Sequence, residues 1–150
     1  MSTRIVAAVI ERADRRFLIG QRRREDSSPL KWEFPGGKVK DGESLEQALA
    51  RELREELEAT LLRSVVISQV EHDYGGSKGS LAITFFAAAI KEADLHPGPF
   101  EQVAWVLPRE LGEYDFLTAN RRLIAELATG RIKPAEILAS RAPSAAPKGH

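Results

Sequence analysis

Apolar residues along the chain fall into short runs rich in branched side chains, a pattern that predicts β-strands. Two such runs, Arg4–Ile10 and Arg16–Gln21, are separated by a turn candidate at residues 13–15, so we expect an antiparallel hairpin. Leu81–Ile90 is a longer run whose only polar residue is Thr84, which is typical of a central, buried strand. Further apolar runs predict strands at residues 61–71 and 103–107.

Helical periodicity appears between these strands. One apolar stripe recurs at every fourth residue, at Leu45, Leu49, Leu53 and Leu57. Ser44, followed three residues later by Gln47, predicts a capping box, so the helix should start there. A second helix is predicted from about residue 118 to residue 128, with Gly130 as its C-cap. Shorter helical segments are predicted at residues 108–111 and 134–139.

Three glutamates lie on one side of the first helix, beside its apolar stripe: Glu52, Glu55 and Glu56. Like charges at i and i+4 destabilise a helix by about 0.2–0.5 kcal/mol per pair, and the helix dipole disfavours anions in the last turns. Acids clustered at this end therefore indicate a divalent cation, and oxygen-only ligands favour a hard ion, Mg2+ or Mn2+. For the segment E-L-R-E-E alone, a plain charged surface helix is an equally good interpretation.

The composition is that of one ordinary globular domain. The chain has 150 residues, of which 43% are hydrophobic and 29% are charged. Lys and Arg total 22 and so do Asp and Glu, and this zero net charge argues against nucleic acid or an anionic membrane as partner. The lack of cysteine excludes disulfides, thiolate metal sites and a Cys nucleophile.

Targeting and domain limits follow from the same composition. The apolar run at residues 5–10 is too short for a signal core or a membrane span, so we expect a cytoplasmic protein. Residues 3–139 are predicted to form a single domain. Residues 140–150 are small, Pro-rich and without periodicity, which predicts a disordered C-terminal tail.

The residues around the first helix resemble the Nudix box at matching spacing. Gly37 is followed after five residues by Glu43, and after seven more by R-E-L-x-E-E from Arg51 to Glu56. The preceding W-E-F-P-G-G-K, residues 32–38, resembles the MutT-type branch of this family, which acts on nucleoside triphosphates.

One position departs from the box, because Glu58 stands where the family carries glycine. Glycine at a helix end usually supplies a left-handed C-cap. Glu58 therefore either adopts that conformation at a cost of about 1 kcal/mol, or the helix leaves by another route. The departure removes no metal ligand.

The resemblance implies an α/β fold: a Nudix-type α/β/α sandwich with a mixed β-sheet and a loop-helix-loop catalytic motif. It implies a Mg2+ or Mn2+ site whose ligands are Gly36, Glu52, Glu55 and Glu56. The general base is then Glu52 or Glu101, the latter four residues before Trp105. Arg51 and Glu43 are expected to orient the carboxylates rather than to react.

The resemblance also implies a small-molecule nucleotide as partner, with contacts from Arg22, Phe34, Lys38 and Asn120. An amide suits the reading of a base edge because it both donates and accepts hydrogen bonds. The other interpretation of Asn120 is a residue that merely sits in the first helical turn. Arg22 belongs to the run R-R-R, which either faces the nucleotide or forms a solvated strand end.

The implied reaction is Mg2+-dependent hydrolysis of a nucleoside triphosphate to a nucleoside monophosphate and pyrophosphate. Such a reaction can cleanse the nucleotide pool of oxidised or modified nucleotides such as 8-oxo-dGTP. Two alternatives stay open: a hydrolase of another nucleoside diphosphate linked to X, such as ADP-ribose or a dinucleoside polyphosphate, and a non-catalytic nucleotide-binding module. Both a monomer and a homodimer are compatible with the resemblance.

Overall fold

The computed structural model describes residues 2–73, 79–91 and 95–140. One mixed sheet is formed by four strands in the order β4-β1-β6-β5. Its members are β1 (Ser2–Ile10), β4 (Gly36–Lys38), β5 (Leu61–Asp73) and β6 (Ser80–Ile90). Strand β1 runs parallel to β6 and antiparallel to β4, while β5 runs antiparallel to β6. The prediction of a central, buried strand at 81–90 is confirmed by β6.

A second, antiparallel sheet has the order β3-β2-β7. It contains β2 (Phe17–Gln21), β3 (Trp32–Glu33) and β7 (Gln102–Val106). The predicted hairpin is therefore wrong, since β1 and β2 lie in different sheets and the bridge recorded between the two runs joins Glu11 to Phe17. The physical reason is that partners distant in sequence occupy the edges of both strands, so the chain turns at 12–16 but the strands diverge.

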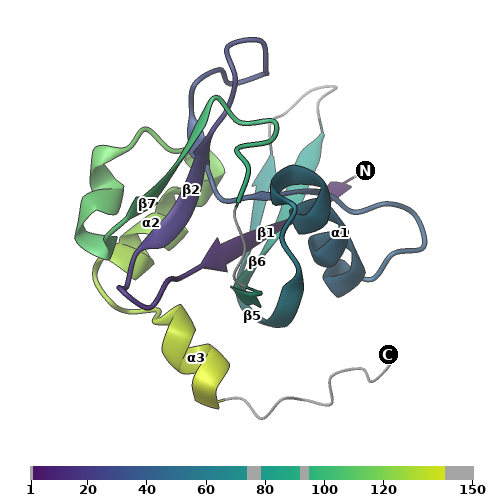
Figure 1. Cartoon of the computed structure of the whole chain (residues 1–150). Helices are drawn as coiled ribbons and strands as arrows, with labels where there is room; N and C mark the ends of the chain where they lie inside the picture. The colour runs from purple at the N-terminus through teal and green to yellow at the C-terminus, as the bar shows by residue number, and fades with distance from the viewer. Residues whose placement is uncertain (1, 74–78, 92–94, 141–150) are drawn as a thin grey trace.

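Helices cover opposite faces of the four-stranded sheet, which confirms the predicted α/β/α sandwich (Figure 1). On one face lies α1 (Leu45–Leu57) and on the other lies α2 (Arg121–Ala128). The remaining helical segments are two 3-10 helices and a short α-helix: η2 (Pro108–Glu113), η3 (Thr118–Asn120) and α3 (Pro134–Ser140). The predicted second helix thus begins as a 3-10 turn. Gly130 has φ +77°, as its predicted C-cap role requires.

The alternation of side chains along β1 creates two hydrophobic cores. Val6 and Ala8 point toward α1, where they pack with Leu49 and Leu53 of the helix. Ala7 and Val9 point to the other face, toward α2 and η2; their partners there are Phe85, Leu111, Leu123 and Leu127. Because the sheet is buried on both faces, α1 is held rigidly against the strands that precede it in sequence.

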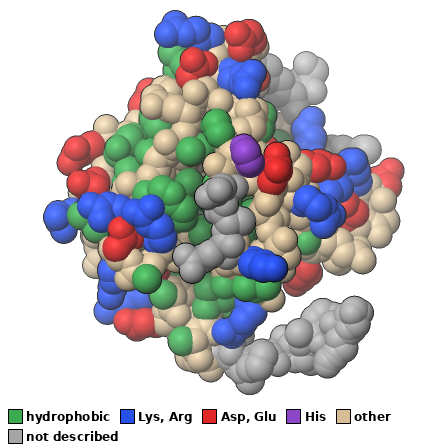
Figure 2. All heavy atoms as spheres, viewed as in Figure 1, with side chains coloured by type: hydrophobic (Ala, Val, Ile, Leu, Met, Phe, Trp, Pro, Cys, Tyr) green, Lys and Arg blue, Asp and Glu red, His purple; other side chains and the backbone are tan. Residues whose placement is uncertain are grey.

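The surface agrees with the zero net charge of the sequence. Lys, Arg, Asp and Glu side chains are interspersed around the face shown in Figure 2. In the part of the chain that the structure describes, no helix is both long and apolar enough to span a membrane. The predicted C-terminal tail lies outside the described residues from 141 onward.

Candidate active site

Helix α1 begins and ends at positions fixed by local hydrogen bonds. The predicted capping box is confirmed: Gln47 N donates to Ser44 Oγ at 3.0 Å, and Ser44 N donates to Gln47 Oε1 at 2.8 Å. At the other end Glu58 adopts the left-handed conformation, with φ +57° and ψ +32°. Of the two outcomes expected at Glu58, the structure shows the left-handed C-cap. The buried face of the helix contains Ala48, Leu49, Leu53 and Leu57.

The glycine loop of β4 lies close against the glutamates of α1 and against the backbone of β1. A Cβ on Gly37 would lie 2.4 Å from Glu52 Cδ, and a Cβ on Gly36 would lie 1.9 Å from the Val6 carbonyl oxygen. The Gly36 N–H donates to Glu56 Oε1 at 3.1 Å. The two glycines thus bring β4 backbone against Glu52 and Glu56.

Arg51 lies at the centre of the acidic cluster. Its Nη1 donates to Glu52 Oε2 at 2.8 Å and to Glu55 Oε1 at 3.2 Å. Its Nε and Nη2 form a fork on the Glu43 carboxylate at 2.6 and 2.9 Å. These hydrogen bonds, with one from the Lys40 N–H, lower the pKa of Glu43 to about 2. The guanidinium therefore fixes three carboxylates relative to one another.

Glu56 is the carboxylate that lacks such a partner. Burial, together with the negative charges of Glu52, Glu33 and Glu55, raises its pKa to about 8, and the hydrogen bond from the Gly36 N–H only partly opposes this rise. The carboxylates of Glu43, Glu52 and Glu55 thus share the Arg51 guanidinium, whereas Glu56 has no cationic partner among the described residues. The cluster therefore carries an excess of negative charge.

A divalent cation fits this donor set. Carboxylate oxygens and the nearby main chain of Gly36 are hard ligands, which suit Mg2+ or Mn2+. Among the described residues, no group of three or more acidic or histidine side chains already converges on one point. The residues that could hold an ion are Gly36, Glu52, Glu55 and Glu56.

Glu33, for which the sequence predicts no role, lies close enough to the cluster for its charge to act on Glu56. Arg22 Nη1 donates to Glu33 Oε1 at 3.2 Å, and Arg22 Nε donates to the Ser27 carbonyl at 2.8 Å. Burial raises the pKa of Glu33 despite the Arg22 guanidinium. The available signal was a carboxylate between two large apolar residues, Trp32 and Phe34, both of which are buried.

Two predicted substrate contacts differ in accessibility. Phe34 is 3% exposed and lies in the core, with its ring centroid 6.2 Å from that of Phe85 and 5.7 Å from that of Phe116. Its surroundings are those of a core residue. Lys38 is exposed at the end of β4, and its carbonyl accepts a hydrogen bond from Arg51 Nη2 at 2.9 Å.

Asn120 is a buried amide, 5% exposed, and within the described ranges its side chain makes no hydrogen bond. No fully buried side-chain polar atom in those ranges lacks a partner, so the Asn120 amide must reach the surface. The segment before it is fixed to β3, since Leu117 N donates to the Trp32 carbonyl at 3.0 Å. Asn120 therefore presents an unused donor and acceptor from a segment tied to the strand that carries Glu33.

Glu101 is exposed and directly precedes β7. Its N–H donates to the Gln21 carbonyl at 2.7 Å, which ties this position to the end of β2. Its side chain forms no hydrogen bond or ion pair with the described residues and is free to turn.

Comparison with known proteins defines the class. The family model of the NUDIX domain matches residues 1–127. The chain therefore belongs to the Nudix family, and it is a Nudix hydrolase.

The relatives place it more narrowly. It is 35% identical over 135 residues to the CTP pyrophosphohydrolase of Escherichia coli, covering 88% of this chain and 96% of that protein. It is 33% identical over 111 residues to a putative 8-oxo-dGTP diphosphatase 2 of Mycobacterium tuberculosis, covering 74% and 78%. A solved structure from a study of MutT from Aliivibrio salmonicida and Vibrio cholerae matches with a TM-score of 0.72 and 31% identity, covering 87% of this chain and 99% of that one. The chain is thus a MutT-like member of the family.

Proposed function

We propose that this hydrolase converts a nucleoside triphosphate to a nucleoside monophosphate and pyrophosphate, with Mg2+ as its cofactor. The observation that carries the proposal is the cluster of carboxylates around Arg51, which has an excess of negative charge and lies beside the glycines of β4. Such a cluster suits a substrate whose phosphates bring divalent cations with them. Relatives named for CTP, 8-oxo-dGTP and nucleoside triphosphates support this substrate class.

The proposed roles divide the site into two parts. Bound Mg2+ supplies charge neutralisation of the phosphate chain and a lowered pKa for the attacking water. Glu52 or Glu101 takes the proton of that water as general base. Arg51 holds Glu52 and Glu55 in place, and its fork on Glu43 fixes the guanidinium itself.

The second part concerns the nucleotide. Asn120 offers both a donor and an acceptor to a base edge, and its lack of a described partner within the fold leaves both available. Arg22 donates hydrogen bonds to Glu33 and Ser27, which fix the position of its guanidinium. Its other N–H groups remain available to a substrate. We propose that these two residues select the base, and that oxidised or modified nucleotides such as 8-oxo-dGTP are the substrates preferred.

A substrate panel tests the proposal. Pyrophosphate release is measured with Mg2+ and with EDTA on dGTP, 8-oxo-dGTP, CTP and a modified dCTP. For ADP-ribose, whose hydrolysis gives AMP and ribose phosphate, AMP release is measured under the same conditions. We expect Mg2+-dependent release from a triphosphate, with preference for one modified nucleotide. Turnover of ADP-ribose alone would overturn the substrate class. Tight nucleotide binding without turnover of any substrate would favour a binding module.

A further inference from the structure

A tight turn at residues 97–100, called here the Gly98 turn, lies between β6 and β7. Phe100 N donates to the Pro97 carbonyl at 3.0 Å, which closes the turn. Gly98 has φ +55°, a conformation that favours glycine. Glu101, one of the two proposed bases, is the next residue after this turn.

The Gly98 turn rests on the backbone of α1 at Glu56, the carboxylate of the cluster that does not contact Arg51 among the described interactions. A Cβ on Gly98 would lie 1.9 Å from the Glu56 carbonyl oxygen and 3.0 Å from the carbonyl carbon. The atoms that it would strike belong to the main chain, so no side-chain rotation could relieve the clash. Any larger residue must move the turn away from α1.

Other contacts fix the turn from the opposite side. Arg23 Nη2 donates to the Gly98 carbonyl at 2.8 Å. The ring of Phe100 packs on Gly20, where a Cβ would lie 2.6 Å from Phe100 Cδ1. Together with the bond from Glu101 N to the Gln21 carbonyl, these contacts clamp the turn between β2 and α1.

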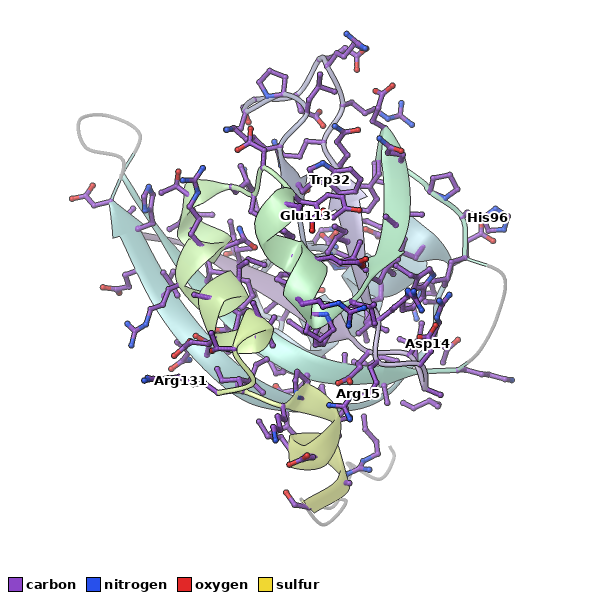
Figure 3. All side chains as sticks on the ribbon, turned by 90° about the vertical axis from the view of Figure 1, so that its left-hand side faces the viewer. Asp14, Arg15, Trp32, His96, Glu113 and Arg131 are labelled. Atoms are coloured by element: carbon purple, nitrogen blue, oxygen red, sulfur yellow. The ribbon has the colours of Figure 1, made fainter. Side chains whose placement is uncertain are left out.

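The same loop also meets the exit of the helix. His96 Nε2 lies 3.7 Å from Glu58 Oε1, and Figure 3 shows His96 projecting outward from the segment that leads into β7. Both side chains are exposed, so this pair contributes little by itself. It does show that the loop follows the end of α1 over more than one residue.

We propose that Gly98 is a positioning residue: its missing side chain sets the distance between Glu101 and the carboxylates of α1. This inference rests on the role proposed above for Glu101. The backbone before Glu101 packs closely against the Glu56 carbonyl, and the Glu101 N–H is hydrogen-bonded to the end of β2, so both contacts define where the Glu101 side chain begins. A displacement of about 1 Å at a reacting group can cost about 100-fold in rate.

The first test compares Gly98→Ala with Gly130→Ala. Both glycines have positive φ, but a Cβ on Gly130 meets nothing closer than Lys133 Cε at 3.7 Å. Gly130→Ala therefore matches the backbone strain without the contact to α1. We expect Gly98→Ala to lower kcat at least tenfold with little change in KM, and Gly130→Ala to keep the wild-type kcat. An unchanged kcat in Gly98→Ala would overturn the proposal.

A double-mutant cycle asks whether Gly98 acts through Glu101. In a Glu101→Gln background, we expect Gly98→Ala to lower kcat less than twofold further. The same large loss in both backgrounds, or a Glu101→Gln variant with wild-type kcat, would contradict the proposal.

If Gly98→Ala does not fold, Arg23→Ala replaces it, because it removes only the hydrogen bond to the Gly98 carbonyl. The matched control is Arg24→Ala, whose side chain makes no hydrogen bond or ion pair among the described residues.

Mn2+ binding followed by electron paramagnetic resonance gives a readout that needs no turnover. A carboxylate that takes a proton from metal-activated water lies close to the ion, and its negative charge adds to the attraction for that ion without coordinating it. We therefore expect Gly98→Ala and Glu101→Gln to weaken Mn2+ binding in the presence of a non-hydrolysable nucleotide by similar factors, and the double variant to weaken it no further. If the wild-type protein hydrolysed no substrate of the panel, the proposed function would fail while this measurement still tested Gly98. Wild-type Mn2+ affinity in both single variants would overturn the inference.

Discussion

At the scale of single residues, one side chain of the site interacts with several charged groups at once. Arg51 contacts the carboxylates of Glu43, Glu52 and Glu55 at once, while Glu56 is left among like charges. Such an arrangement is costly for the isolated protein, because burial and repulsion both disfavour the Glu56 anion. It becomes favourable when positive charge arrives. The arrangement therefore supports the proposed cation site over the alternative of a plain charged helix.

Glu43 gives a prediction in acid. Its pKa is lowered to about 2 by Arg51, so ionised Glu43 stabilises the folded state above its ordinary pKa of 4.5, and this contribution is lost as pH falls toward 2. We expect Glu43→Gln to be less stable than wild type at pH 7, with the difference disappearing toward pH 2. Urea unfolding across this pH range measures it. A difference that stayed constant with pH would contradict the assigned ion pair.

At the scale of elements, the exit of α1 shows how this chain does without the family glycine. Glu58 takes the left-handed conformation, its N–H donates to the Arg54 carbonyl at 3.0 Å, and Ala59 N donates to the Leu53 carbonyl at 3.1 Å. These hydrogen bonds complete the helix end. The cost of the conformation falls on the backbone of one exposed residue.

A pair of substitutions measures that cost. Glu58→Gly and Glu58→Ala both remove the contact with His96, so they differ only in backbone preference. We expect the glycine variant to be more stable by about 0.5–1 kcal/mol, since relief of the left-handed strain exceeds the entropy that glycine adds to the unfolded chain. Thermal unfolding distinguishes them. Equal stability, or a more stable alanine variant, would contradict the strained cap.

The sequence was informative where the interactions are local. The capping box at Ser44, the stripe of leucines and the shared face of the glutamates all follow from spacing within one helix. Strand pairing could not be read in this way: nothing in Arg4–Ile10 shows that it pairs with Ser80–Ile90 instead of with its neighbour in sequence. Glu33 and Gly98 acquire their meaning only from segments far away in the chain, and so sequence reasoning passed over both.

At the scale of the whole molecule, the sandwich brings three separated segments to one place. Helix α1 supplies the carboxylates, β4 supplies the glycines that approach them, and the Gly98 turn connects β7 to the end of α1. The two hydrophobic cores hold α1 and α2 on opposite faces of one sheet. The site is thus formed by tertiary packing around one short sequence motif.

The central claim is that the protein performs Mg2+-dependent hydrolysis and requires the carboxylates of α1 to do so. The most direct measurement is pyrophosphate release by wild type, Glu52→Gln and Glu46→Gln, each with Mg2+ and with EDTA. Glu46 lies exposed in the first turn of the same helix, so it controls for loss of a helix charge. We expect EDTA to abolish wild-type turnover, Glu52→Gln to lower it by about 100-fold or more, and Glu46→Gln to leave it unchanged. Wild-type turnover by Glu52→Gln, or full activity in EDTA, would contradict the account.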